Sequence, residues 1–417
     1  MSKSPKVITL GCRLNAFESE IMRTQAENAG LENTVIFNTC AVTSEAERQA
    51  RQQIRKLRRE NPDTRIIVSG CAAQIAPAKY GAMPEVDQVL GNEEKLKIES
   101  YSPDKSQDKI LVSDIMRATE IAGHLISGFE SRSRAFVQIQ QGCDHRCTFC
   151  IIPFGRGNSR SVPIDHIIDQ VGHLTEQGYQ EVVFTGVDIS SYGGDLPGRP
   201  NLGQMTQCLL AAVPELQRLR LSSLDPAVID YQLMDLIAAE PRLMPHIHLS
   251  VQAGSDLILK RMKRRHNRQD IIDLCARIRR LRPEVVFGAD LITGFPTESD
   301  TMFEDTLRLV DDAGLTYLHV FPYSLRLETP AANMPQVADK VRKSRAAELR
   351  RKGEDTTAAY FEKLPGQTAK ILVERNSQGY TETYAPVRLD QEYEQGAIVS
   401  ALITGSSPKG LIVELTP

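Results

Sequence analysis

The 417-residue sequence has no long apolar run, no low-complexity tract, no short-period repeat and little net charge. No run approaches the roughly 18 apolar residues that a membrane-spanning helix requires. The first residues lead into a short strand and not into the apolar core of a signal peptide, so we expect a cytoplasmic protein without a membrane partner. The formal net charge of −3 does not indicate a nucleic-acid partner, but it is a weak guide when basic residues are clustered.

Against these absences, the chain contains eight cysteines. A disulfide framework is typical of short secreted chains, so we interpret the cysteines mainly as metal-cluster ligands in a reducing compartment. Cys208 and Cys275 are exceptions, because they lie in helical patterns among apolar residues and are expected to pack in the core. The remaining cysteines form two groups of three, which are the candidate functional residues.

The first group, Cys143, Cys147 and Cys150, has the spacing C-x3-C-x2-C within one tight loop. Thiolates so close in sequence can converge on one soft metal centre. A structural zinc site is normally closed by four ligands, and an ordinary iron–sulfur cubane by four cysteines. Three ligands leave one coordination position open, as a catalytic cluster requires. The alternative is a zinc loop whose fourth ligand is remote or is His145.

The second group, Cys12, Cys40 and Cys71, is spread over the N-terminal third, and each member lies just after a predicted strand. The strands are 7–10, 34–37 and 65–68. Their alternation with helical patterns predicts a parallel sheet, and the carboxyl ends of its strands face a ligand crevice. The three thiols could therefore hold a second cluster with one open iron. The alternative is three unrelated buried cysteines.

The central half continues the strand–helix alternation at a longer period. Strands are expected at 136–140, 181–185, 219–222, 246–252, 285–292 and 317–321. Six units are too few for the eight of a closed barrel, so they predict an open partial barrel with a lateral opening. Polar or glycine residues follow several strands and should meet at one rim: Gly186, Asp188, Ser223, Gln252 and Asp290.

The C-terminal part begins with a long charged helix, expected over residues 339–363. Short strands follow, at 368–373, 383–387, 397–403 and 411–415. This pattern predicts a small antiparallel barrel, similar to modules that bind RNA. The alternative is a β cap that only stabilises the edge of the central barrel.

Together these motifs resemble the radical S-adenosylmethionine (SAM) methylthiotransferase family, over nearly the whole chain. The matching stretches are residues 9–15, 38–43, 69–72, 142–157, 250–255 and 321–324. The resemblance implies an α/β protein with three domains. These are an N-terminal methylthiotransferase domain with an open parallel sheet at 1–125, a partial (β/α)6 radical SAM barrel at 130–362 and a TRAM-like RNA-binding β-barrel at 364–417.

The resemblance also implies the cofactors, which are two [4Fe-4S] clusters and SAM. The catalytic cluster would be held by Cys143, Cys147 and Cys150 and would bind SAM at its open iron. The second cluster, on Cys12, Cys40 and Cys71, would carry the sulfur that is transferred. Residues in the cysteine loop and at the barrel rim are expected to contact SAM: Phe149, Gly186, Asp188, Ser223, Gln252 and Asp290.

The motif Gly11-Cys12-Arg13-Leu14-Asn15 resembles the branch that acts on N6-threonylcarbamoyladenosine beside the tRNA anticodon. The implied reaction is insertion of a methylthio group at C2 of that nucleoside. The implied partners are the anticodon stem-loop of tRNA and an electron donor such as a flavodoxin or ferredoxin. Alternative substrates are isopentenyladenosine in tRNA and an aspartate of a ribosomal protein. A non-enzymatic alternative is an iron–sulfur carrier or an RNA-binding module.

Overall fold

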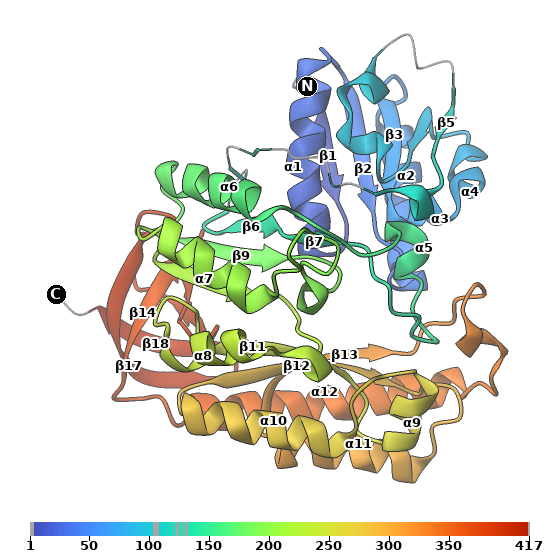
Figure 1. Ribbon diagram of the computed structural model, residues 1–417. Coiled ribbons are helices and arrows are strands. Elements are labelled where there is room, and N and C mark those ends of the chain that lie inside the picture. The colour runs from blue at the N-terminus through green and yellow to red at the C-terminus, as the bar shows by residue number, and fades with distance from the viewer. Residues whose placement is uncertain are drawn as a thin grey trace.

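The computed structural model describes residues 4–102, 108–119, 121, 125–126, 128–129 and 132–415. A parallel sheet at the N-terminus is followed by a longer parallel sheet and then by a small closed β-barrel (Figure 1). The α/β fold class expected from the sequence is confirmed. The expected boundary between the first two domains, at 125–130, falls partly outside the described residues.

The N-terminal sheet has the strand order β1-β2-β3-β4-β5, and every neighbouring pair is parallel. Its strands are β1 (Lys6–Thr9), β2 (Thr34–Thr39), β3 (Arg65–Gly70), β4 (Gln88–Leu90) and β5 (Ile110–Leu111). Ile36 packs in the core with Met22 of α1 (Arg13–Asn28), whereas Phe37 packs with Ile54 of α2 (Ser44–Glu60). Helices thus cover both faces, as expected for a parallel sheet. The sequence did not predict β4 and β5.

The central sheet contains six parallel strands, as predicted. They are β6 (Ala135–Gln138), β9 (Glu181–Thr185), β10 (Arg218–Leu221), β11 (His246–Gln252), β12 (Val286–Thr293) and β13 (Leu315–Pro322). The strands form two halves with the orders β10-β9-β6 and β11-β12-β13. The two halves are joined by the β-bridges Leu219–Leu243 and Leu224–Leu249. β6 and β13 are the two edges, so the barrel is open on one side.

Helices cover the convex side of this sheet (Figure 1). They are α6 (Ile164–Glu176), α7 (Leu202–Ala212), α8 (Tyr231–Ala239), α10 (Arg268–Leu281), α11 (Asp300–Asp312) and α12 (Asp339–Phe361). Shorter elements elsewhere in the chain are α3 (Cys71–Ile75), α4 (Pro77–Gly81), β7 (Gln140–Gln141), α5 (Ile152–Arg156), β8 (Arg160–Ser161) and α9 (Asp256–Arg261).

The C-terminal barrel closes in the order β14-β15-β16-β18-β17. Its strands are β14 (Thr368–Val373), β15 (Gln378–Tyr380), β16 (Pro386–Arg388), β17 (Ile398–Ser407) and β18 (Gly410–Leu415). The sequence predicted four of these strands and missed β15. Among the described residues, no helix has both the length and the apolar character needed to cross a bilayer.

The C-terminal barrel docks at the beginnings of β9 and β10, at the left in Figure 1. Along β10, Arg218 and Arg220 alternate with leucines and therefore share one face of the sheet. Arg218 Nη2 donates to the carbonyl of Lys370 at 2.8 Å, and Arg220 Nη1 donates to that of Glu382 at 2.9 Å. Glu181 of β9 lies between the two arginines and forms ion pairs with both. These buried contacts attach the C-terminal barrel firmly to the concave side of the central sheet.

Candidate active site

The loop from Cys143 to Cys150 is held in place by backbone contacts on two sides. The amide of Thr148 donates to the carbonyl of Met262 at 3.1 Å, and its hydroxyl donates to that of Arg261 at 2.7 Å. On the other side, the amide of Ala331 donates to the carbonyl of Thr148 at 2.9 Å. Burial raises the pKa of Cys143 to about 12 and that of Cys150 to about 11. A metal must therefore displace protons from these thiols when it binds.

The second cysteine group lies where the sequence predicted it, at the carboxyl ends of β1, β2 and β3. Cys12 is the N-cap of α1, Cys40 follows β2 directly, and Cys71 begins α3. Two of the preceding turns require glycine. Gly11 has a φ of +100°, and a Cβ there would lie 2.6 Å from the Cβ of Cys40. Gly70 has a φ of +93°, and its Cβ would lie 2.3 Å from a backbone oxygen of β2.

A buried charge network lies against the second group. Arg156, at the end of α5, donates from Nε to the Sγ of Cys71 at 3.0 Å. Its Nη2 donates to Oδ1 of Asn15 at 2.5 Å and to Oε2 of Glu18 at 2.8 Å. Lys95 Nζ donates to the same Glu18 oxygen at 2.6 Å. One carboxylate thus faces two cations, and the excess positive charge beside Cys71 suits a thiolate bound to a metal.

Arg156 connects the two cysteine groups, and the sequence analysis missed it. It follows Cys150 by six residues in the chain, yet its guanidinium contacts Cys71. Burial by itself would lower the pKa of Arg156, but Cys71 and Glu18 raise it well above its ordinary value. The segment that leaves the first cysteine loop therefore supplies a fixed charge to the second group.

The donor sets fit iron–sulfur clusters better than single ions. A tetrahedral zinc ion, with Zn–S distances of about 2.3 Å, would gather its sulfur ligands to about 3.8 Å from one another. Among the described residues, only His248, Asp290 and His319 bring three potential ligand atoms within 4.8 Å of one another. Neither cysteine group is gathered so tightly, as expected when each thiolate binds a different iron of a cubane.

The rim residues predicted to contact SAM fall into two places. Asp188 lies beside the cysteine loop, with Oδ2 4.0 Å from the Sγ of Cys143 and 3.1 Å from Nε2 of His145. Gly186, two residues earlier, packs so closely that a Cβ would lie 2.8 Å from the carbonyl oxygen of Gln140. Ser223 lies farther around the sheet, where its hydroxyl donates to Oδ2 of Asp290 at 3.3 Å.

The remaining two predicted SAM contacts differ in their surroundings. Gln252 ends β11 with a φ of +73°, a strained conformation for a residue with a side chain. Phe149 packs edge-on against Phe295, with their ring centroids 6.4 Å apart, in a small apolar cluster behind the loop.

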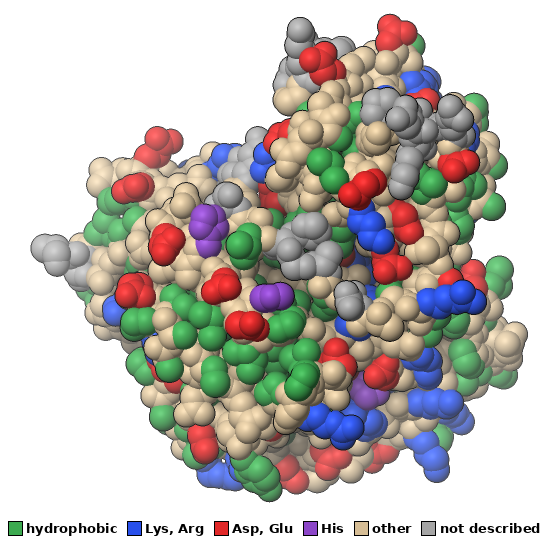
Figure 2. Space-filling model, turned by 45° about the horizontal axis from the view of Figure 1, so that its top comes forward, with side chains coloured by type: hydrophobic (Ala, Val, Ile, Leu, Met, Phe, Trp, Pro, Cys, Tyr) green, Lys and Arg blue, Asp and Glu red, His purple; other side chains and the backbone are tan. Residues whose placement is uncertain are grey.

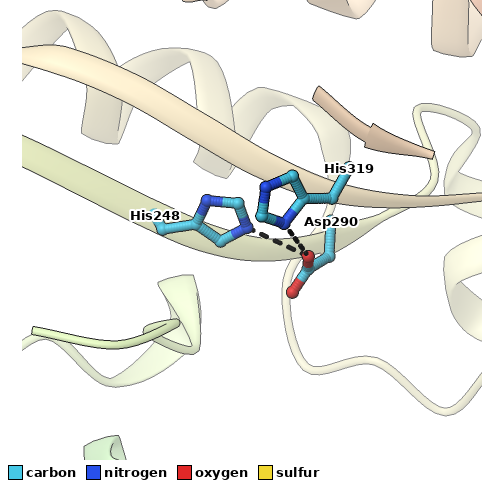
Figure 3. Close-up of side chains that lie close together, drawn as sticks. All are labelled: His248, Asp290 and His319. Atoms are coloured by element: carbon cyan, nitrogen blue, oxygen red, sulfur yellow. Dashed lines mark hydrogen bonds and ion pairs between the residues drawn. The ribbon is translucent and has the colours of Figure 1, made fainter. Parts of the chain in front are cut away.

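A histidine pair around Asp290 was not predicted. Asp290 lies on β12. His248 of β11 and His319 of β13, the strands on either side of β12, point toward the same carboxylate oxygen of Asp290 (Figure 3). The distances to Oδ1 of Asp290 are 3.0 Å from Nε2 of His248 and 3.3 Å from Nδ1 of His319. Burial would raise the pKa of Asp290, but the two hydrogen bonds hold it well below its ordinary value. The alternation along β11 and β13 was the signal that could have placed these rings on the concave face.

One of the two core cysteines was assigned wrongly. Cys275 is buried in α10, as predicted, but Cys208 of α7 is exposed. The residues that follow it, Leu209 and Leu210, are apolar, but the helical period turns position 208 toward solvent.

Two family descriptions match the chain. Residues 137–310 match the radical SAM superfamily, and residues 5–91 match a family described as uncharacterized protein family UPF0004. A solved radical SAM methyltransferase, TsrM from Kitasatospora setae, aligns with a TM-score of 0.56 over 80% of this chain and 74% of that chain. At 13% identity, the likeness shows the fold alone.

Closer relatives are found among curated proteins. The threonylcarbamoyladenosine tRNA methylthiotransferase MtaB of Rickettsia prowazekii is 54% identical over 96% of this chain and 94% of that protein. The MtaB of Aquifex aeolicus is 33% identical over 95% of this chain and 98% of that protein. A tRNA-2-methylthio-N(6)-dimethylallyladenosine synthase of Staphylococcus aureus is 32% identical over 90% of this chain and 77% of that protein.

The radical SAM match and the curated relatives make this chain a radical SAM enzyme of the methylthiotransferase class. Within that class, the chain belongs to the MtaB family of threonylcarbamoyladenosine tRNA methylthiotransferases.

Proposed function

We propose that this enzyme inserts a methylthio group at C2 of N6-threonylcarbamoyladenosine beside the anticodon of tRNA. The observation that carries the proposal is that Arg156, six residues after Cys150 in the chain, contacts Cys71, so the segment leaving the first cysteine group packs against the second. A radical generated at one group would be of use for sulfur insertion only if the sulfur is held nearby. The extensive identity to MtaB proteins supports the choice of substrate within the class.

The roles of the cysteines follow from their positions. Cys143, Cys147 and Cys150 would hold the cluster that, with SAM, supplies a 5′-deoxyadenosyl radical able to attack an unactivated carbon. Cys12 and Cys40, with Cys71, would hold the cluster that supplies the methylthio group. Neighbouring side chains would hold SAM and its surroundings in place: Phe149, Gly186, Asp188, Ser223, Gln252 and Asp290.

Three further assignments complete the proposal. Residues 1–125, 130–362 and 364–417 would be the methylthiotransferase, radical SAM and TRAM-like domains, with the last one contacting the anticodon stem-loop. Charges of both signs are interspersed over the face in Figure 2, with Lys and Arg gathered toward its lower right, so phosphate contacts would be local. An electron donor such as a flavodoxin or ferredoxin would serve the enzyme in the cytoplasm.

The test compares tRNA nucleosides from cells with and without this gene by mass spectrometry. We expect 2-methylthio-N6-threonylcarbamoyladenosine to vanish on deletion and to return when the gene is restored. Loss of the 2-methylthio derivative of isopentenyladenosine would assign the enzyme to the other tRNA branch. Loss of an aspartate modification in a ribosomal protein would exclude both tRNA functions.

A further inference from the structure

Tyr384, in the turn after β15, is surrounded by guanidinium groups. The guanidinium carbons of Arg220, Arg134 and Arg13 lie 4.6, 5.0 and 6.0 Å from the centroid of its ring. Two of these arginines form ion pairs with Glu181, at 2.9 Å for Arg220 and 3.1 Å for Arg134, and Arg134 also pairs with Glu374 at 3.0 Å. The third is Arg13, and its charge is not balanced in the same way.

Arg13 has no carboxylate partner among the residues that the structure describes. Its polar contact is with the hydroxyl of Tyr384, to which Nη2 donates at 3.4 Å, and its guanidinium also lies 6.0 Å from the ring of Phe136. The side chain is half-buried. A partly desolvated cation without a counter-charge is costly, so a bound anion at this position would be stabilised.

The position of Arg13 relates this cation to the reaction site. It follows Cys12 directly and faces the concave side of the central sheet, where Phe136 lies on β6. His246 lies on the same side, and desolvation, followed by nearby cations that include Arg220 and Arg13, lowers its pKa well below the ordinary value. His246 is therefore neutral at pH 7, and it does not supply positive charge to a ligand here.

We propose that Arg13, assisted by the Tyr384 hydroxyl, binds the carboxylate of the threonyl group of the substrate nucleoside. This inference rests on the proposed function. The threonylcarbamoyl group carries a carboxylate, which isopentenyladenosine lacks, and the planar guanidinium can donate two parallel hydrogen bonds to it. Arg13 would thus be a specificity-determining residue that selects the substrate through its charge, next to the cysteine group that supplies the sulfur.

The test combines one protein change with one substrate change. The RNA is an anticodon stem-loop carrying N6-threonylcarbamoyladenosine, or the same RNA with the threonyl carboxylate converted to its methyl amide. The proteins are the reconstituted full-length enzyme and its Arg13→Met variant. The readouts are the Kd of each RNA and kcat/KM for methylthiolation.

For the unchanged enzyme, the amide should weaken binding about tenfold to a hundredfold, because a hydrogen-bonded charge pair is lost. Arg13→Met should bind the carboxylate RNA more weakly by a similar factor and should show no further loss with the amide. Arg13→Lys should retain most of the preference for the carboxylate. Tyr384→Phe should lose a smaller part of it.

Arg132→Met is the matched control, because Arg132 is a second arginine near the ring of Phe136, at 5.1 Å, but is exposed and is not one of the arginines around the ring of Tyr384. Its preference for the carboxylate RNA should equal that of the unchanged enzyme. Arg13→Met should also keep its iron content and its cleavage of SAM without RNA.

Two results would overturn the inference. One is an unchanged enzyme that binds the amide RNA as tightly as the carboxylate RNA, which needs no variant to observe. The other is an Arg13→Met variant that still prefers the carboxylate. An unchanged enzyme that cleaves SAM but does not methylthiolate the threonylcarbamoyl RNA would instead contradict the proposed function, and the inference with it.

Discussion

The two cysteine groups of this protein are built in different ways. Cys143, Cys147 and Cys150 lie in one loop, and their relative positions depend on a few hydrogen bonds from neighbouring segments. Cys12, Cys40 and Cys71 come from three strand ends and meet only because the strands are adjacent and parallel. The first group is a local structure, whereas the second depends on the sheet.

The surroundings of the two groups differ in the same way. The second group is backed by Arg156, Glu18 and Lys95, whose side chains are at most 1% exposed. Beside the first group, Arg264 Nη1 lies 3.8 Å from the Sγ of Cys147, and the charge of Arg264 is shared with Asp225 at 3.4 Å. A site assembled from distant segments needs a rigid, charge-balanced support, and in this protein part of that support comes from α5, just beyond the other site.

The largest expected effect separates the two groups completely. Cys147→Ser should abolish the formation of 5′-deoxyadenosine, because the cluster proposed to bind SAM would lose a ligand. Cys71→Ser should retain that reaction but should not produce methylthiolated RNA. Chromatography of 5′-deoxyadenosine and mass spectrometry of the RNA measure both activities.

Cys208→Ser is the control for this pair, because Cys208 is exposed and lies outside both groups. It should keep both activities. If Cys71→Ser lost SAM cleavage while the iron bound to the first group remained, the division of roles between the groups would be wrong.

A smaller effect is expected when the connection between the groups is removed. Arg156→Met leaves Glu18 opposed by Lys95 alone and removes the donor to Cys71. Because Lys95 still balances the Glu18 carboxylate, the cost is that of the lost charge-assisted hydrogen bonds, about 1.5–3 kcal/mol of folding free energy. The expected result is a lower midpoint of urea unfolding and a loss of iron from the second group, with SAM cleavage retained.

Arg48→Met is the comparison for Arg156→Met. Arg48 pairs with Glu45 on the exposed surface of α2, where water screens the charges and the pair contributes little to stability. The two variants should therefore differ clearly in their unfolding midpoints. Equal midpoints would show that the buried network does not stabilise the N-terminal region.

The smallest effects on activity are expected from removing single hydroxyl groups that hydrogen-bond beside each cysteine group. Thr148→Val removes the hydrogen bond to the carbonyl of Arg261, and Thr39→Val removes one to the carbonyl of Ser69 at 2.5 Å. Each change should cost about 1–3 kcal/mol, because a buried carbonyl loses its donor. Thr148→Val should lower the rate of SAM cleavage, and Thr39→Val should lower methylthiolation alone. If the two variants affected SAM cleavage and methylthiolation in the reverse way, or in the same way, the two cysteine groups would not be supported separately.

The parts of the fold that repeat a simple pattern were predictable. The strands β1, β2 and β3 and the six strands of the central sheet have the apolar character and the flanking turns that identify strands. β4, β5 and β15 have only two or three residues each, and a segment that short carries no periodic signal. They form because neighbouring strands offer unpaired backbone groups.

The residues of the candidate site likewise divide into those with a recognisable local pattern and those without one. The two groups of three cysteines were recognised in the sequence, because thiols at a characteristic spacing or at successive strand ends form a recognisable pattern, and their role as cluster ligands stays a prediction. Arg13, Arg156 and the histidines around Asp290 were not recognised, because arginine and histidine are common and their partners lie far away in the chain.

The sequence by itself determined the two groups of cysteines and the order of the three regions, since these depend on residue type and local period. Only the tertiary structure decided that Arg156 contacts Cys71, that Asp290 lies between two imidazoles and that Arg13 lacks a carboxylate partner among the described residues. Charge balance in a buried site depends on Coulomb interactions between side chains. These weaken with distance in space and with the local dielectric constant, and they do not depend on separation along the chain.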